Sequence, residues 1–448
     1  MSSSLAELLE RLEASGLLTH DELRAFLDAQ PPPDRPADAR QLAAALVRAG
    51  RLTRYQAAIV YHGQNEPLLY GDYVVLDRIG AGGAGVIYRA EHRHMKRQVA
   101  LKLLAAERTR SPSAVRRFLQ EVEMAARLNH PNIVASFDAG QHNGQYFLAM
   151  ELVEGVNLGS LVRRHGPLAV TTALDCTIQC ARGLEYAHQQ GVVHRDIKPA
   201  NLLLDRGGTV KILDMGLARQ VDERQAAAET AANQDLTHAG QILGTFTYMA
   251  PEQAADTRRA DHRADIYSLG CTLHYLLTGS AVYGGETIVA KIVAHREHPI
   301  PSLRKRRADV PRPVDDVFRR MLAKRPEDRF QSCGELIGAL ERARVAGDSP
   351  SSGHRIEEPE LLSFLHSQDG DRGLVDFLDA VGERGRDEPS ASSSSVSSSS
   401  IGTATGRVRR SRGTRRSGQR RRRPWGFLLI LLVALLAAGA LVGLALSP

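Results

Sequence analysis

The segment from His194 to Asn201 places three chemically useful side chains within six residues. Asp196 has a carboxylate that can take a proton from a hydroxyl, and Lys198 has an ammonium group that can neutralise a phosphate. Asn201 has a carboxamide oxygen that can ligate Mg²⁺. Phosphoryl transfer depends mainly on positioning and charge stabilisation, so this segment predicts that chemistry. The prediction depends on whether the other parts that the reaction needs occur elsewhere in the chain.

A glycine-rich segment follows the apolar run at residues 73–76. A second run that favours a strand comes directly after it, so the glycines are expected at the tip of a hairpin. A G-x-G-x-x-G pattern between a strand and a helix would instead indicate a dinucleotide site. A hairpin tip favours a flap over the phosphates of ATP, because glycines let backbone N–H groups approach the oxygens. The residues of this expected flap are Ile79, Gly80, Ala81, Gly82, Gly83, Ala84, Gly85, Val86 and Ile87.

The order of these segments resembles that of the eukaryotic-type protein kinases. The segment around Asp196 resembles the catalytic loop H-R-D-x-K-x-x-N, in the form typical of the serine/threonine class. Val99–Lys102 resembles the V-A-I-K strand, and Asp214-Met215-Gly216 resembles the D-F-G element with Met in place of Phe. Residues 244–252 resemble the end of the activation segment. The likeness covers about residues 73–343 and looks most like the bacterial Hanks-type serine/threonine kinases.

The resemblance implies a role for each matched residue. Asp196 would orient and deprotonate the substrate hydroxyl, while Lys198 would stabilise the transferred charge. Asn201 and Asp214 would hold Mg²⁺ or Mn²⁺, and Lys102 would bind the α- and β-phosphates of ATP.

Lys102 would also need an acidic partner from the amphipathic helix expected around residues 117–121. Glu121 is the expected partner. Glu123 is the alternative, but it lies two residues on and would point to a different face of the helix.

The nucleotide pocket is likewise expected from the resemblance. Met150 would be the gatekeeper, and the backbones of Glu151 and Val153 would hydrogen-bond the adenine. Further contacts are expected from Ala100, from Leu203 as the floor of the pocket, from either Ile87 or Val86, and from Asn157 to the ribose.

Four other residues are expected to support the site. By resemblance, Thr245 would hydrogen-bond near Asp196 and mark a serine/threonine kinase. Glu252 would pair with Arg329, and Asp265 would cap the backbone of the catalytic loop.

The segment between Asp214 and Glu252 is polar, rich in alanine and too long to pack unaided. Kinases with an arginine before the catalytic aspartate, here Arg195, often use it to bind a phosphorylated loop. We therefore expect autophosphorylation at Thr230 or Thr237, because a phosphate there would offer a dianion to Arg195.

Residues 1–70 contain an internal repeat, in which each copy reads helix, glycine, apolar residue and new helix. Gly16 and Gly50 suit the left-handed residue after a helix end. The expected capping boxes are Thr19 with Glu22 and Thr53 with Gln56. This pattern predicts a small bundle of helical hairpins that serves as a packing or interaction module. A sensor or substrate-docking role is the alternative.

The net charge and the cysteine content argue against several classes of function and site. The net charge is +7, but ten arginines between Arg407 and Arg423 account for more than all of it, since 7 − 10 = −3. The remaining chain is mildly acidic, so nucleic-acid binding is not expected. The four cysteines form no C-x-x-C pair, which argues against a zinc site and a disulfide framework. Cys176 and Cys180 are expected to be small core residues.

The C-terminal region predicts a membrane anchor. Ser390–Ser400 is almost pure serine and should be disordered. The arginines follow, and then the uncharged run 425–446, whose 22 residues span about 33 Å as a helix. Arginines on one side would keep the preceding chain cytoplasmic and attract anionic lipid. Gly439-x-x-x-Gly443 could pair helices into a homodimer, but chance occurrence in a span rich in Ala, Gly and Leu is the favoured interpretation. No cleavable N-terminal signal and no external sensor domain are expected.

The expected fold class is α+β: a bilobal protein kinase fold with a small β-rich lobe and a larger helical lobe, plus an N-terminal helical-hairpin module and a C-terminal transmembrane helix. The expected boundaries are 1–70 for the module, 73–343 for the kinase domain, 344–424 for a mostly disordered linker and 425–446 for the membrane helix.

The expected function is that of a membrane-anchored serine/threonine protein kinase in bacterial signal transduction, with protein substrates. Two alternatives stay open at this point. One is a catalytically dead signalling scaffold, and the other is a kinase domain whose main task is to present the N-terminal bundle at the membrane.

Overall fold

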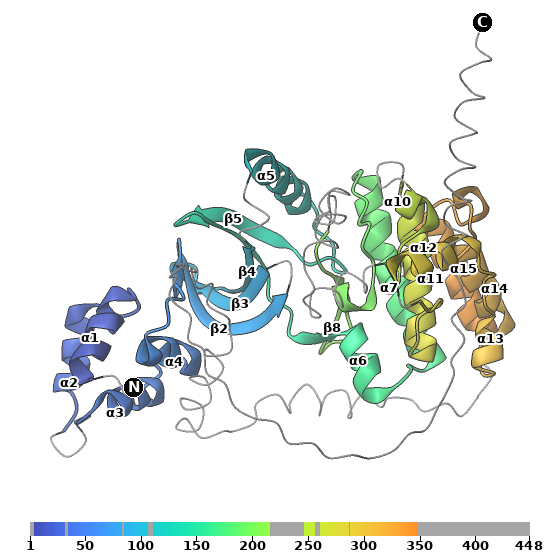
Figure 1. The fold of residues 1–448 in the computed structure, drawn as a ribbon. Helices are drawn as coiled ribbons and strands as arrows, with labels where there is room; N and C mark the ends of the chain where they lie inside the picture. The colour runs from blue at the N-terminus through green and yellow to red at the C-terminus, as the bar shows by residue number, and fades with distance from the viewer. Residues whose placement is uncertain are drawn as a thin grey trace, which may run out of the picture. The chain divides into compact units, whose positions relative to one another are not determined.

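The computed structural model describes residues 4–31, 35–82, 85–105, 111–215, 246–255, 260–285 and 287–347. Within these ranges, four helices precede a six-stranded sheet. A mainly helical region that contains a second, three-stranded sheet comes after it in the chain (Figure 1). None of the helices in the described ranges is long and apolar enough to cross a bilayer. The serine run, the arginine run and the expected membrane helix at 425–446 lie outside the described residues.

Four short amphipathic helices form the N-terminal region: α1 (Leu5–Ala14), α2 (His20–Asp28), α3 (Ala39–Arg48) and α4 (Arg54–His62). The expected helices, capping boxes and glycine turns are present in this region. Both expected capping boxes are reciprocal, each with a Thr side chain that accepts from the third helical N–H and a Glu or Gln that accepts from the cap N–H. Gly16 and Gly50 follow α1 and α3 with φ of 67° and 66°, a conformation that glycine adopts without strain.

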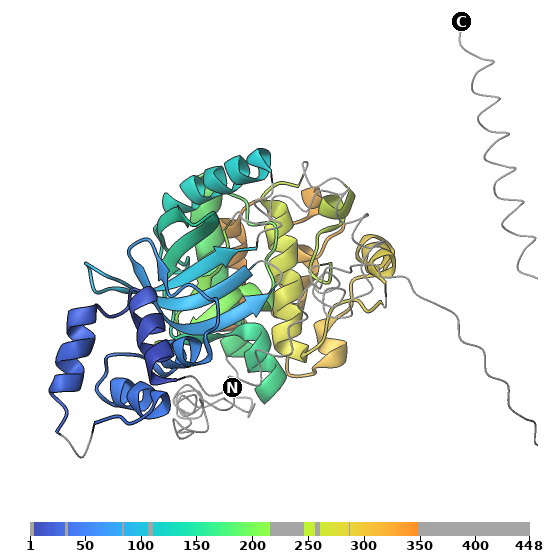
Figure 2. The ribbon, with the colours of Figure 1, turned by 60° about the vertical axis from the view of Figure 1, so that its left-hand side comes forward.

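The six-stranded sheet is antiparallel throughout, in the order β1-β2-β3-β4-β6-β5. Figure 2 shows the helix α5 (Pro112–Ala126) beside this sheet. We call this sheet with α5 the small lobe. Its strands are β1 (Leu69–Tyr70), β2 (Tyr73–Gly82), β3 (Gly85–His92), β4 (Gln98–Leu104), β5 (Ser136–His142) and β6 (Gln145–Glu151).

The hairpin of β2 and β3 carries the glycine-rich segment at its tip, as expected. Gly85 begins β3 with a φ of 129°, and a Cβ atom there would lie 1.8 Å from the carbonyl oxygen of Leu103. Both the backbone conformation and the close approach to β4 therefore require glycine at this position.

The apolar core of the small lobe continues into the N-terminal helices. Leu46 and Ile59 belong to the same buried cluster as Val75, Tyr88 and Leu101. The expected boundary at residues 70–73 therefore stays a prediction, and the hydrophobic core crosses it.

The large lobe follows β6. It contains the three-stranded sheet β7 (Gly155–Asn157), β8 (Leu202–Asp205) and β9 (Val210–Ile212). Its helices are α6 (Leu158–His165), α7 (Val170–Gln189), α10 (Pro251–Ala255), α11 (Arg263–Thr278), α12 (Ile288–Glu297), α13 (Leu303–Arg306), α14 (Arg312–Met321) and α15 (Cys333–Gly347), with 3₁₀ turns at Pro199–Asn201 and Pro326–Asp328. The helices α7 and α11 supply much of the buried core.

All four cysteines lie buried as free thiols in the large lobe. Cys176 and Cys180 are core residues of α7, as predicted. Burial raises the pKa of the Cys176 thiol to about 12 and also raises the pKa of the other three thiols.

Two buried histidines of the large lobe make its stability depend on pH. His274 and His295 are 0% and 2% exposed, and burial lowers the pKa of each from 6.5 to about 4. The folded state therefore binds fewer protons than the unfolded chain between these two pH values. We expect the free energy of unfolding to keep the full contribution of both groups above pH 6.5, and to fall as the pH drops toward 4.

Each histidine can add a slope of up to about 1.4 kcal/mol per pH unit in this window. Urea unfolding, followed by circular dichroism at several pH values, measures the slope. His274→Phe keeps a ring next to Phe318, on which His274 stacks at 5.8 Å between ring centroids. This variant should show a smaller dependence of the free energy of unfolding on pH, because the contribution of one histidine is removed. An unchanged pH dependence would contradict the lowered pKa of His274.

Candidate active site

Asp265 fixes the backbone of the catalytic loop from the first turn of α11. Its two carboxylate oxygens accept hydrogen bonds from the N–H groups of His194 and Arg195, at 2.9 and 2.7 Å. His188 on α7 contacts the same carboxylate at 2.8 Å. Burial alone would raise the pKa of Asp265, but the hydrogen bond and charge interaction with His188, together with the contacts from His194, hold its pKa below the ordinary value. The expected capping role of Asp265 is thus matched by its contacts.

Two side chains of the catalytic loop, Lys198 and Asn201, contact the carboxylate of Asp196. The Lys198 Nζ lies 2.7 Å from Oδ2 of Asp196. The Asn201 Nδ2 donates to the same Oδ2 at 3.0 Å and to the Asp196 carbonyl oxygen at 2.9 Å. Because the carboxamide nitrogen of Asn201 makes both bonds, its Oδ1 is turned away from Asp196. Asp196 is 20% exposed at its side chain, so a hydroxyl can reach it from solvent.

Lys102 and Asp214 form the second part of the site. The Lys102 Nζ on β4 lies 2.6 Å from the Asp214 Oδ1, although the two residues are 112 positions apart in the chain. Lys102 is 6% exposed, so its ammonium group is held inside the protein and needs a partner of opposite charge. Asp214 also has a left-handed φ of 57°. Such backbone conformations in non-glycine residues cluster at functional sites.

Leu213 connects the two parts through its backbone. Its N–H donates to the Asn201 carbonyl oxygen at 2.9 Å. His194 Nδ1 accepts from the Asp196 N–H at 3.1 Å, so Nε2 carries the proton and donates to the Leu213 carbonyl oxygen at 2.8 Å. Lys102, Asp214, Asp196 and Asn201 are therefore linked in one continuous network, as the kinase interpretation requires.

The expected partner of Lys102 was Glu121, which lies on α5. Its side chain is outside the part of the chain that the structure describes. Glu123 pairs with Arg127 at 2.6 Å and is 67% exposed. Among the described side chains, Lys102 contacts Asp214, and the alternative partner, Glu123, faces solvent.

An apolar cluster borders this network. Ala100 and Met150 face each other across β4 and β6, and Ile87 and Val153 pack against them. Val86, one residue before Ile87, packs instead against the core shared with the N-terminal helices. Of the two residues left open by the sequence, Ile87 is thus the one that faces the expected adenine pocket.

The structure also describes the surroundings of three further residues expected to contact the nucleotide. Ile79 is 54% exposed at the start of the glycine-rich tip. Leu203 is half-buried on β8, where it pairs with Asn157 on one side and Lys211 on the other. The Asn157 Oδ1 accepts from the Ser160 N–H at 2.8 Å and so caps α6.

Some expected residues lie outside the described ranges. These are Gly83 and Ala84 at the hairpin tip, and Gly216, Thr230, Thr237 and Thr245 in the segment after Asp214.

Glu252 and Arg329 form the expected ion pair, with two parallel contacts of 2.6 and 2.7 Å. Arg329 is fully buried, and its remaining N–H groups donate to the carbonyl oxygens of Ala323, Arg263 and Lys324. All five guanidinium donors are therefore used. The pair ties α10, which ends the activation segment, to the core of the large lobe.

Two supporting contacts were not expected from the sequence. Lys211 on β9 pairs with the Glu151 side chain at 2.8 Å, which joins the expected hinge to the strand before Asp214. Gln253 on α10 donates to the Arg195 carbonyl oxygen at 2.7 Å. Gln253 directly follows the Ala-Pro-Glu motif, and this adjacency was the one available signal.

The donor set fits a magnesium ion that is shared with phosphates. Asp214 and Asn201 offer hard oxygen ligands, and Oδ1 of Asn201 is not used for its bonds to Asp196. Among the described residues, no group of three or more His, Cys, Asp or Glu side chains could hold a metal alone. Mg²⁺ commonly binds through one or two carboxylates and the phosphates of a substrate.

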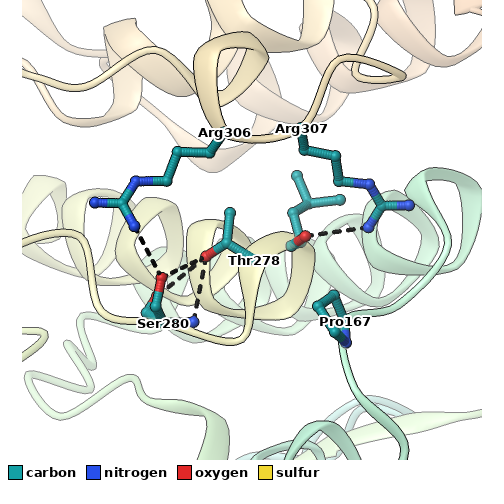
Figure 3. A pocket seen from close by; sticks show the side chains of 6 residues that line it. Pro167, Thr278, Ser280, Arg306 and Arg307 are labelled. Carbon is teal, nitrogen blue, oxygen red and sulfur yellow. Dashed lines mark hydrogen bonds between the residues drawn. The ribbon is translucent and has the colours of Figure 1, made fainter.

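A separate cavity of about 400 Å³ lies in the large lobe, lined by Pro167, Leu277, Thr278, Ser280, Arg306 and Arg307. In Figure 3, Arg306 reaches Ser280, with 3.5 Å between Nη1 and Oγ. Arg307 is paired with Asp309 at 2.8 Å. None of the residues lining this cavity belongs to the expected nucleotide site.

Comparisons with known proteins show which family the chain resembles in sequence. The family model described as protein kinase domain matches residues 73–337. The serine/threonine-protein kinase PknB of Mycolicibacterium smegmatis is 35% identical over 338 residues, covering 74% of this chain and 52% of PknB. PknH of Mycobacterium bovis is 38% identical over 275 residues, covering 61% of this chain and 44% of PknH. The chain spans about half the length of these relatives. A crystal structure of the Mycobacterium tuberculosis PknI kinase domain is 30% identical, covers 61% of this chain and 97% of that one, and has a TM-score of 0.48.

Proposed function

Because the chain belongs to the protein kinase family, in its bacterial Hanks-type serine/threonine class, we propose that it transfers the γ-phosphoryl group of ATP to serine or threonine hydroxyls of proteins. The observation that carries this proposal is the network that joins Lys102 and Asp214 to Asp196 and Asn201. These side chains come from segments far apart in the sequence, and each has the chemistry that phosphoryl transfer requires.

In this proposal, Asp196 accepts the proton of the substrate hydroxyl and orients its oxygen for attack. Lys198, 2.7 Å from Asp196, stabilises charge on the transferred group. Lys102 holds the phosphates, and Asp214 and Asn201 hold the metal. A bound Mg²⁺ or Mn²⁺ would supply charge neutralisation between the phosphates. Ile87, Ala100, Met150 and the hinge at residues 151–153 border the adenine.

Transfer of radiolabelled phosphate from ATP to a generic basic protein tests this function. We expect incorporation into serine and threonine in the presence of Mg²⁺. A chain that binds ATP but transfers no phosphate would instead support the alternative of a signalling scaffold.

We propose that the chain also phosphorylates itself at Thr230 or Thr237. Arg195 supports this, because it directly precedes the catalytic aspartate. Its cation could bind a phosphate on the segment between Asp214 and Glu252, which contains both threonines. Mass mapping of the active protein decides it, and two unmodified threonines would remove the proposal.

Membrane anchoring through residues 425–446 is a further proposal, supported by the length of the uncharged run and by the ten arginines before it. We expect the full chain to stay in the membrane pellet after an alkaline wash, with the kinase domain on the cytoplasmic side and arginines near anionic lipid. A chain truncated after residue 388 should appear in the supernatant. Full-length protein in the supernatant would contradict the anchor and, with it, pairing of two copies through Gly439 and Gly443.

A further inference from the structure

The outer edge of β2 is only partly covered by another strand. The two-residue strand β1 pairs with Tyr73 and Val74, and the Val75 N–H donates to the Leu68 carbonyl oxygen at 2.9 Å. A residue in an antiparallel strand directs its N–H and C=O to the same side. The carbonyl group of Val75 therefore points to the edge where β1 has already ended.

Two side chains of the N-terminal helical region continue the coverage of this edge. The Gln56 Nε2 donates to the Val75 carbonyl oxygen at 2.6 Å, and the Thr53 Oγ1 donates to the Leu76 carbonyl oxygen at 2.6 Å. Gln56 is 4% exposed, so its contact is shielded from water. The start of α4 thus replaces a neighbouring strand, and Figure 1 shows α4 beside β2.

The two contacts are made where β2 is irregular. The pairing of β2 with β3 shifts register between Val75 and Asp77, and again between Arg78 and Gly80. Such bulges leave a residue outside the ladder and bend the strand. Thr53 satisfies the carbonyl group of the first bulged residue, Leu76. Only three residues separate Leu76 from Gly80, so the direction of the strand at this bulge sets where the glycine-rich tip lies.

The capping box at the start of α4 leaves the donor atoms of Thr53 and Gln56 available for these two contacts. In the box, Gln56 Oε1 accepts from the Thr53 N–H at 2.8 Å, and Thr53 Oγ1 accepts from the Gln56 N–H at 3.1 Å. The box uses only acceptor atoms, so the amide NH₂ and the hydroxyl hydrogen remain for the strand. In the other copy of the repeat, Glu22 stands where Gln56 stands here, and a carboxylate has no donor to give.

A second contact reaches both strands of the hairpin. Tyr55 on α4 donates its hydroxyl to Oε2 of Glu66. The other oxygen of Glu66 lies 3.8 Å from the guanidinium of Arg78 on β2, and the hydroxyl of Tyr88 on β3 lies 3.5 Å from Oε2. The helix α4 is therefore connected to the hairpin at both of its register shifts.

We infer that Thr53 and Gln56 clamp the bulge of β2, and that Gln56 is a positioning residue for ATP because it sets the glycine-rich hairpin. This inference rests on the proposed function, in which the hairpin covers the phosphates. The N-terminal helices would then contribute to nucleotide affinity, a role that goes beyond the packing or interaction module expected from the sequence.

The decisive variant of the full-length chain is Gln56→Glu. A glutamate keeps the acceptor that the capping box needs, but it removes the donor and places a carboxylate against the carbonyl group of Val75. Leaving a buried acceptor unpaired corresponds to roughly a tenfold effect. We expect the Kd for a fluorescent ADP analogue and the KM for ATP each to rise roughly tenfold, with kcat at saturating ATP changed less than about twofold because the catalytic loop is untouched.

Glu22→Gln is the matched control, since it makes the reverse exchange in the exposed box of the other copy and should change neither value. Thr53→Ser keeps the hydroxyl and should bind nucleotide like the parent, whereas Thr53→Val should weaken binding as Gln56→Glu does. Thr53→Val also serves as the test if Gln56→Glu does not fold. Unchanged nucleotide affinity, or an equal loss of kcat and affinity together with a lower Tm, would overturn the inference. Nucleotide titration does not depend on phosphate transfer, so a parent chain that binds but does not transfer would refute only the proposed function.

Discussion

Asp196→Asn is expected to lower kcat by about 10²- to 10⁴-fold, the usual contribution of a positioned general base. The amide of asparagine cannot accept the proton of the substrate hydroxyl, and it leaves the ammonium of Lys198 without the carboxylate that lies 2.7 Å away. Nucleotide affinity should change by less than about twofold, because Lys102 and Asp214 keep their own contact of 2.6 Å. Steady-state phosphate transfer and nucleotide titration on the same preparation measure both quantities.

The matched control is Asp316→Asn on α14, whose carboxylate is 65% exposed and lies 3.9 Å from Arg312. It should transfer phosphate at the parent rate. Turnover of Asp196→Asn close to that of the parent would mean that another group takes the proton, and the assignment of the base would be wrong.

Glu252→Ala is expected to lower the free energy of unfolding by about 3 kcal/mol, because it leaves a buried guanidinium without its counter-charge. Arg329 is fully buried and makes two short contacts with Glu252. Its three bonds to backbone carbonyl oxygens remain, so we place the effect at the lower end of the range known for broken buried pairs. Urea unfolding of parent and variant measures the difference.

Asp175→Ala provides the comparison for this ion pair. Asp175 and Arg344 are also 2.6 Å apart, but their side chains are 50% and 42% exposed. Loss of an exposed pair should cost less than about 1 kcal/mol. If both variants lost the same stability, burial of Arg329 would not be what makes its pairing important.

Much of the candidate site could be predicted from the types of residues and their order along the chain. Asp196, Lys198 and Asn201 lie close together in the chain, so their meeting around one carboxylate needed only a local loop. The pairing of Glu252 with Arg329 was predictable through the family resemblance, since 77 residues separate the two. The choice between Ile87 and Val86 needed the sheet, because neighbouring residues of a strand point to opposite faces.

The family resemblance implied the capping of the catalytic loop by Asp265, but the other contacts between a side chain and a distant backbone atom could not be predicted. The capping box of α4 was visible as Thr53 and Gln56, but nothing in the sequence says which carbonyl groups the remaining donors meet. The substitution of Gln56 for the Glu22 of the other copy was the one visible sign. The contact of Lys102 with Asp214 was likewise not expected, because the family resemblance directed attention to Glu121.

The burial of all four cysteines has a practical consequence for spectroscopy. Thiolates are the reactive form, and thiols held in an apolar core with a raised pKa are inert toward labelling reagents. A Met95→Cys change in the turn between β3 and β4, where the native side chain is 67% exposed, would therefore add an exposed thiol to a chain whose four native thiols are buried. A spin label or fluorophore attached there would mark the small lobe at one defined site without prior removal of any native thiol.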